Sequence, residues 1–187
     1  GSNDSARIPR HVAVDAGSMM RCGLFAASTY PKVVPDSVLA DYLSFCHNSG
    51  TVQFEPGKAL DVARKVVAAA PDFSWGWSAV ALGAGIGANA DPTGPRAADL
   101  RKEAGEAADK AIELDKSNSE ALMVKALLSD PHDYVGQEKL FKAAIEARPL
   151  ACGCEHHIYG TMLMSVGRVG DATDEYRRST DVLALDM

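Results

Sequence analysis

Residues 58–71 of this 187-residue chain read KALDVARKVVAAAP, a helical stretch of small residues that ends at a proline. The same arrangement returns three times further along, each time followed by a position that ends the helix. These four stops are Pro71, Lys116, Pro149 and Ala184, with spacings of 45, 33 and 35 residues. A period near 34 residues is typical of arrays of helical hairpins. The spacing therefore predicts an all-α repeat fold, with a generic helical bundle as the alternative.

The residues ahead of each stop repeat in a fixed register. The four segments are Ala59-x3-Ala63-x2-Val66, Ala104-x3-Ala108-x2-Ala111, Gln137-x3-Phe141-x2-Ala144 and Ala172-x3-Tyr176-x2-Ser179. Apolar spacing and capping residues predict helices over 36–49, 57–70, 74–88, 96–114, 118–129, 135–148, 153–166 and 169–184. These eight helices form four hairpins. The proline- and glycine-rich loop at 89–95 is expected to account for the longer second repeat.

The sequence divides the chain into three parts. Residues 1–2 (Gly-Ser) are interpreted as the remnant of an expression tag. Residues 3–35 form an N-terminal segment whose structure the sequence does not define, and residues 36–187 form the repeat domain. The chain is expected to be a fragment of a larger regulatory or sensory protein.

Composition excludes several classes of function. Hydrophobic residues make up 47% of the chain, enough for a buried core, whereas aromatic residues make up only 6%. The formal net charge of −6 argues against nucleic acid as a ligand, because phosphate binding needs a basic surface. The sequence contains no stretch of about 18 apolar residues, so it predicts no membrane-spanning segment. Acidic residues that alternate with lysines over 102–113 are interpreted as a solvated helix face.

The first helices of the hairpins resemble those of the tetratricopeptide repeat (TPR) family. The matching segments are Trp77-x2-Val80-Ala81, Leu122-x2-Lys125-Ala126 and His156-x2-Tyr159-Gly160-x2-Leu163, with Gly167-Arg168 at the turn inside the last hairpin. The resemblance implies a TPR-like α-solenoid of about four hairpins. The sequence departs from the family pattern at Lys116, Ala184, Lys125 and Leu163.

In the TPR family, the first helix of each hairpin lines a groove that holds a peptide or a partner helix. The resemblance therefore implies a protein or peptide partner, and a second copy of the chain is one candidate. Carried onto this sequence, the groove would consist of Trp75, Ser78, Leu82, Glu120, Met123, Leu127, Cys154, His157, Thr161 and Met164. For Trp75 and Met123, packing against the neighbouring hairpin is the alternative.

The chain has four cysteines, at positions 22, 46, 152 and 154. Cys22 and Cys46 are candidates for a disulfide in the poorly matched N-terminal part, with two free buried thiols as the alternative. If the bridge forms, it favours a periplasmic or other extracytoplasmic location, and otherwise a cytoplasmic one. Such a location fits a looser resemblance to the TPR-like region of bacterial membrane-anchored winged-helix transcription regulators.

The segment Cys152-Gly153-Cys154-Glu155-His156-His157 is the cluster with metal-ligand residue types. Zinc sites usually need a second, separated pair of ligands, and the sequence offers none, so no metal and no cofactor are predicted. His156 occupies the tryptophan position of the repeat and is therefore expected in the core. No catalytic motif is present. The sequence predicts a non-catalytic scaffold, with a metal or small-ligand sensor at Cys152–His157 and a structural or dimerisation spacer as alternatives.

Overall fold

The computed structural model describes residues 35–49, 55–147 and 154–184, and all the regular secondary structure in these ranges is helical. Its helices are α2 (Asp36–Ser49), α3 (Pro56–Ala69), α4 (Ser74–Ala90), α5 (Ala97–Leu114), α6 (Ser119–Leu128), α7 (Tyr134–Ala147), α8 (Cys154–Ser165) and α9 (Val169–Ala184). They coincide with the eight expected helices to within about two residues, the usual uncertainty of a helix end. The prediction of an all-α fold is confirmed.

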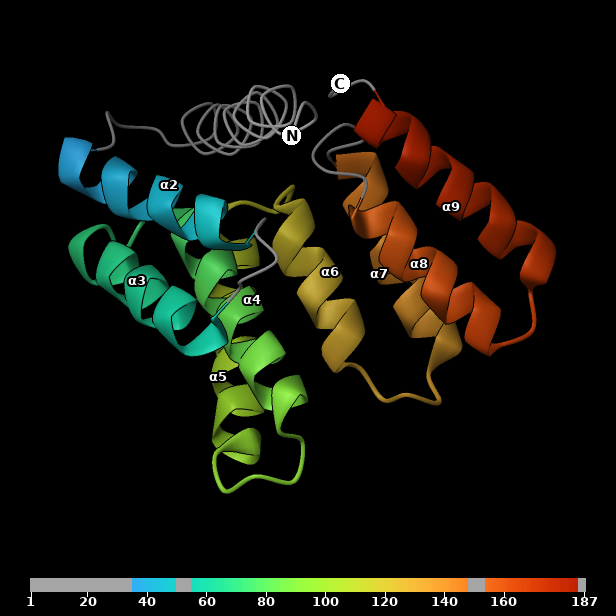
Figure 1. Ribbon diagram of the computed structural model, residues 1–187, viewed down its shortest axis with the longest axis horizontal. Helices are drawn as coiled ribbons and strands as arrows, with labels where there is room; N and C mark the ends of the chain where they lie inside the picture. The colour runs from blue at the N-terminus through green and yellow to red at the C-terminus, as the bar shows by residue number, and fades with distance from the viewer. Residues whose placement is uncertain (1–34, 50–54, 148–153, 185–187) are drawn as a thin grey trace, which may run out of the picture.

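The helices pair into four consecutive hairpins, α2/α3, α4/α5, α6/α7 and α8/α9. Figure 1 shows the hairpins following one another from α2/α3 on the left to α8/α9 on the right. The first helix of one hairpin also packs against the first helix of the next, α4 against α6 and α6 against α8. This order of contacts makes the described residues a TPR-like solenoid rather than a bundle around one centre.

Two ends of helices show why the chain turns where it does. Asn118 is the N-cap of α6, and its side-chain oxygen accepts a hydrogen bond of 3.0 Å from the backbone N–H of Ala121. Gly167 follows α8 with a φ of +80°, a conformation that glycine adopts without strain. The N–H of Arg168 then donates to the carbonyl of Leu163 at 2.9 Å, which closes the helix end.

The second repeat is longer for a different reason than the sequence suggested. Helices α4 and α5 have 17 and 18 residues, whereas α6 and α7 have 10 and 14. The connection over residues 91–96 is close in length to the connection over 129–133. The expectation that the loop accounts for the extra residues is wrong, because both helices of this hairpin are extended instead.

The core of the described residues falls into two clusters. The first joins α2 to α5 with part of α6 and is rich in alanine, which allows close helix packing. The second joins α6 to α9 around Phe141, Tyr159 and Leu163. In the last hairpin, a Cβ atom on Gly160 would lie 3.0 Å from the Tyr176 ring. A larger residue would therefore push α8 away from α9, as the repeat pattern predicts for this position.

Some predictions concern residues outside the described ranges. The N-terminal segment, apart from Pro35, and the position of Cys22 lie outside them, so the division of the chain at residue 36 stays a prediction. Among the described helices, none combines the length and the apolar character needed to cross a bilayer.

Candidate partner-binding face

The first helices α4, α6 and α8 provide the surface on which the sequence places the groove, called here the A-helix face. Of the ten expected groove residues, five are exposed: Leu127, Cys154, His157, Thr161 and Met164. Leu82 and Glu120 are half-buried. These seven side chains come from α4, α6 and α8, so the array brings residues about 80 positions apart onto connected helices.

The other three expected groove residues are interior, and the prediction is wrong for them. Trp75 belongs to the alanine-rich core and Met123 to the second core, so both pack against neighbouring hairpins. Ser78 is fully buried at the contact between α4 and α6. Their positions follow from the close packing of successive first helices, which hides the residues that face the next hairpin.

Beneath the A-helix face, a hydrogen bond joins two hairpins. The Oγ of Ser78 lies 2.7 Å from Oε2 of Glu120 and 3.1 Å from the carbonyl oxygen of Trp75. A serine hydroxyl has a single proton and so can donate to only one of these oxygens. A protonated Glu120 would resolve this by donating to Ser78, leaving Ser78 free to donate to Trp75.

The electrostatics of Glu120 agree with that arrangement. The pKa of Glu120 is raised from its usual 4.5 to about 7, chiefly by burial; the hydrogen bond with Ser78 lowers it and the negative charge of Glu155 raises it. Glu155, in the first turn of α8, is itself buried, and this burial raises its pKa. Two carboxyl groups from α6 and α8 therefore sit within electrostatic reach of each other on this face.

The contact between α8 and α9 contains a group of polar and charged side chains that the sequence did not reveal. Nδ1 of His156 lies 2.6 Å from Oε2 of Glu175, and both side chains are about 10% exposed. Arg178 donates to the other carboxylate oxygen of Glu175 at 2.6 Å. The prediction that His156 is a core residue is confirmed. A histidine in a tryptophan position needs a polar partner, and Glu175, at an apolar position of α9, is the signal that could have identified it.

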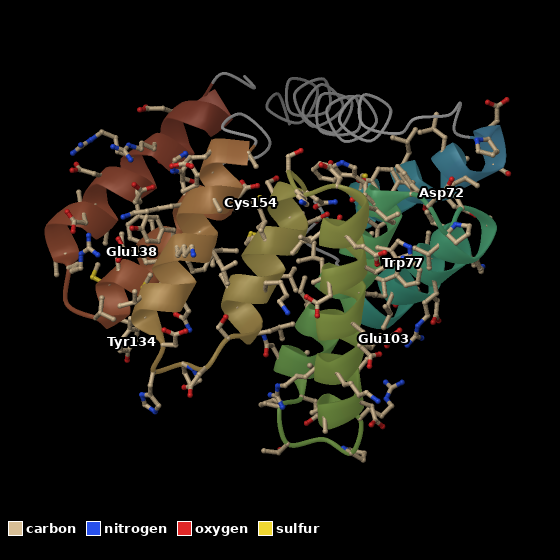
Figure 2. The ribbon with its side chains drawn as sticks, turned by 180° about the vertical axis from the view of Figure 1, so that it is seen from behind. Asp72, Trp77, Glu103, Tyr134, Glu138 and Cys154 are labelled. Atoms are coloured by element: carbon tan, nitrogen blue, oxygen red, sulfur yellow. The ribbon has the colours of Figure 1, made fainter. Side chains whose placement is uncertain are left out.

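A second ionic group ties α7 to the last hairpin. Glu138 accepts hydrogen bonds from the hydroxyl of Tyr159 and from Arg168, both at 2.8 Å, and forms an ion pair with Lys142. These three donors, Lys142 first, lower the pKa of Glu138 to about 2. Figure 2 shows Glu138 on the side of the molecule opposite the view of Figure 1. Nothing in the sequence pattern pointed to this group, because its members lie on α7, on α8 and in the turn between α8 and α9.

The cysteine and histidine cluster does not form a metal site in the described residues. Cys154 and Cys46 are both disulfide-bonded, so the alternative of a free buried thiol is wrong for Cys46. A sulfur in a disulfide is not a thiolate and does not serve as a ligand for zinc. The described residues contain no group of three or more side chains suited to a metal ion. The pairing of Cys22 with Cys46 stays a prediction.

No protein-family model matches the chain, and no curated protein matches it. Among solved structures, the chain is similar to one described as MamA MSR-1 C2, at 14% sequence identity and a TM-score of 0.46. The match covers 95% of this chain and 96% of the other. Similarity at that level does not indicate a function, so the function has to be inferred from the residues themselves.

Proposed function

We propose that the chain is a non-catalytic scaffold that binds a protein or peptide on its A-helix face. One observation supports this most: α4, α6 and α8 form a connected surface whose centre is the half-buried carboxyl group of Glu120. Exposed apolar side chains, Leu127 at 47% and Met164 at 45%, lie on the same helices. A mixture of adaptable apolar side chains and one buried charge suits recognition of a peptide.

The charge on this face indicates the chemistry of the partner. Glu120 and Glu155 destabilise each other when both are ionised, since each sits in a poorly hydrated position. A lysine or arginine side chain placed between them would relieve that repulsion and favour the ionised form of Glu120. The proposed partner is therefore a peptide segment with a basic residue flanked by apolar residues. Binding should release a proton near neutral pH.

The test is a selection of displayed random peptides on the intact chain at pH 7.5. We expect the selected peptides to share a lysine or arginine beside an apolar residue. Replacing Glu120 with glutamine, which keeps the shape but removes the charge, should weaken their binding at least about tenfold. The control is Lys139→Ala, an exposed residue on α7. Selected peptides that bind the E120Q variant as tightly as the parent would place the site elsewhere.

The alternative function as a metal sensor has no supporting observation in the described residues. Its two exposed members, Cys154 and His157, include one sulfur that is disulfide-bonded. The role of a dimerisation spacer predicts a concentration-dependent mass for the isolated chain. That outcome, with no selected peptide depending on Glu120, would replace the peptide-binding proposal.

A further inference from the structure

A second open surface lies between α3 and α5, on the side of the molecule where Figure 2 marks Trp77 and Glu103. Among the described helices, α4 packs closely against both α3 and α5, whereas α3 and α5 do not pack closely against each other. The space between them is a groove of about 780 Å³ with an apolar floor of Trp77 and Val80. Its walls include the apolar residues Val67, Pro71 and Ala107.

The floor of this groove is held rigidly. Nε1 of Trp77 donates to the carbonyl oxygen of Pro71 at 2.8 Å, which fixes the indole ring at one end. Val80 is buried beneath the surface and packs in the alanine-rich core. The half-buried ring of Trp77 therefore presents a fixed apolar surface rather than a mobile side chain.

A smaller cavity of about 300 Å³ lies nearer the start of α3. Gly83 and Gly87 of α4 line it, and a Cβ atom on Gly83 would lie 3.2 Å from the backbone of Leu60, so this glycine allows α3 and α4 to pack closely. Arg64 lines both cavities and bridges to Glu103 on α5, with nitrogen–oxygen distances of 2.8 and 2.7 Å. The two cavities adjoin at Arg64, and together they are called here the α3/α5 trough.

The length of the trough matches a short helix. The residues of α3 and its end that line it run from position 57 to position 71. At 1.5 Å per residue this corresponds to roughly 20 Å, the length of a helix of about four turns. A helix laid along two other helices with its apolar stripe inward is a common mode of recognition.

The charges on the α5 wall of the trough limit which side chains a partner can place beside it. Beside Trp77, the α5 wall carries Glu106, whose side chain is 71% exposed and pairs with Lys102 only at 3.8 Å. Such an exposed ion pair contributes little to stability, so a cation of a partner can take the place of Lys102 beside Glu106. Lys110 on the same wall is already paired with Glu113 at 2.9 Å. The position open to a partner's charge is therefore acidic.

We propose that the α3/α5 trough binds an amphipathic α-helix of a partner protein. A bulky apolar side chain of that helix packs over Trp77, and a lysine or arginine on its flank pairs with Glu106. Because a helix of four turns extends over both cavities, the ion pair between Arg64 and Glu103 opens to admit its end. This surface shares helix α4 with the A-helix face but none of the expected groove residues, and no lining residue comes from α6 or α8.

The test uses two designed helical peptides of about 14 residues, with the same leucine stripe and either lysine or glutamate on the flank facing α5. Binding to the intact chain is followed by tryptophan fluorescence and calorimetry. We expect the lysine peptide to bind at least about tenfold more tightly than the glutamate peptide. Equal affinities, or no binding of either peptide at millimolar concentration, would overturn the proposal.

Two variants locate the binding on the chain. Ala68→Trp fills the trough from an exposed position on α3 and should remove binding of the lysine peptide. Ala69→Trp, the exposed neighbour outside the lining, is the matched control and should not affect it. Glu120→Gln should also leave it unchanged, which separates this proposal from the proposed function. A self-association of the free chain that A68W abolishes would assign the trough to a second copy and contradict a partner helix.

Discussion

Hairpins α4/α5 and α8/α9 carry the same repeat register but solve the same packing problem with different chemistry. Trp77 of the first occupies the position of His156 in the second, and Ala107 occupies the position of Glu175. The first pair is apolar and lines the α3/α5 trough, while the second is a buried polar contact with a nitrogen–oxygen distance of 2.6 Å. The repeat geometry therefore fixes where two helices meet. It does not fix whether apolar contact or charge holds them together.

The largest expected effect tests whether the two cores are separate. Phe141→Ala should destabilise the chain by about 3–5 kcal/mol, because the ring is fully buried and stacks on Tyr159 with centroids 5.7 Å apart. Phe73→Ala is the matched change in the alanine-rich core, where Phe73 meets Tyr42 edge-on. Hydrogen exchange should show F141A loosening α6 to α9 first. Uniform loosening of all helices by both variants would show a single cooperative core.

The variant with the next largest expected effect tests the contact between His156 and Glu175 in the last hairpin. Glu175→Ala leaves His156 buried and Arg178 without its partner, and should cost about 3 kcal/mol in chemical denaturation. The double variant H156W/E175A copies the Trp77–Ala107 pair of the second hairpin and should recover most of this loss. A double variant no more stable than E175A would mean that the two hairpins are not equivalent at this position.

Glu120 gives a pH dependence of intermediate size. Its folded pKa of about 7 lies above the usual 4.5, so the folded chain holds a proton that the unfolded chain has lost. Below pH 4.5 this group has no effect on stability; between pH 4.5 and 7 stability falls as pH rises, by about 3 kcal/mol in total. Glu120→Gln should therefore stabilise the chain at pH 8 and leave it unchanged at pH 4. Identical thermal unfolding curves for both proteins at pH 8 would contradict this account of the A-helix face.

The smallest effect has the opposite sign and comes from Glu138. Its pKa of about 2 lies below the usual value, so its stabilising contribution is complete above pH 4.5 and is lost as pH falls toward 2. Its partners Lys142 and Arg168 are about half exposed, with 56% and 44% of their side chains accessible, so water screens the interaction. Glu138→Gln should cost about 1 kcal/mol at pH 7 and nothing near pH 2, measured by urea titration. A loss that persists at pH 2 would point to packing rather than charge.

The helices were predictable because their signals are local. Proline at 71, the cap at Asn118 and the turn at Gly167 each act within a few residues, so their spacing alone placed the helix ends. The site was less predictable, because it depends on contacts across hairpins. Trp75 and Met123 have the repeat register of groove residues, yet the packing of the next hairpin buries both.

Charges show the same limit in the other direction. Glu103 and Glu106 are interpreted from sequence as a solvated helix face, and they are indeed accessible on α5. Only the separation of α3 from α5 makes them the wall of a trough above Trp77. The repeat register describes positions along one helix and not the separation of two helices. The sequence therefore carried no signal for the α3/α5 trough.

The most direct test of the central claim is a map of nitrogen–proton NMR shifts caused by the tightest selected peptide. The proposed function predicts shifts centred on the contact between Ser78 and Glu120 and extending along α8 to His157, with loss of these shifts in the E120Q variant. Shifts confined to α7 and α9, or unchanged in E120Q, would contradict it.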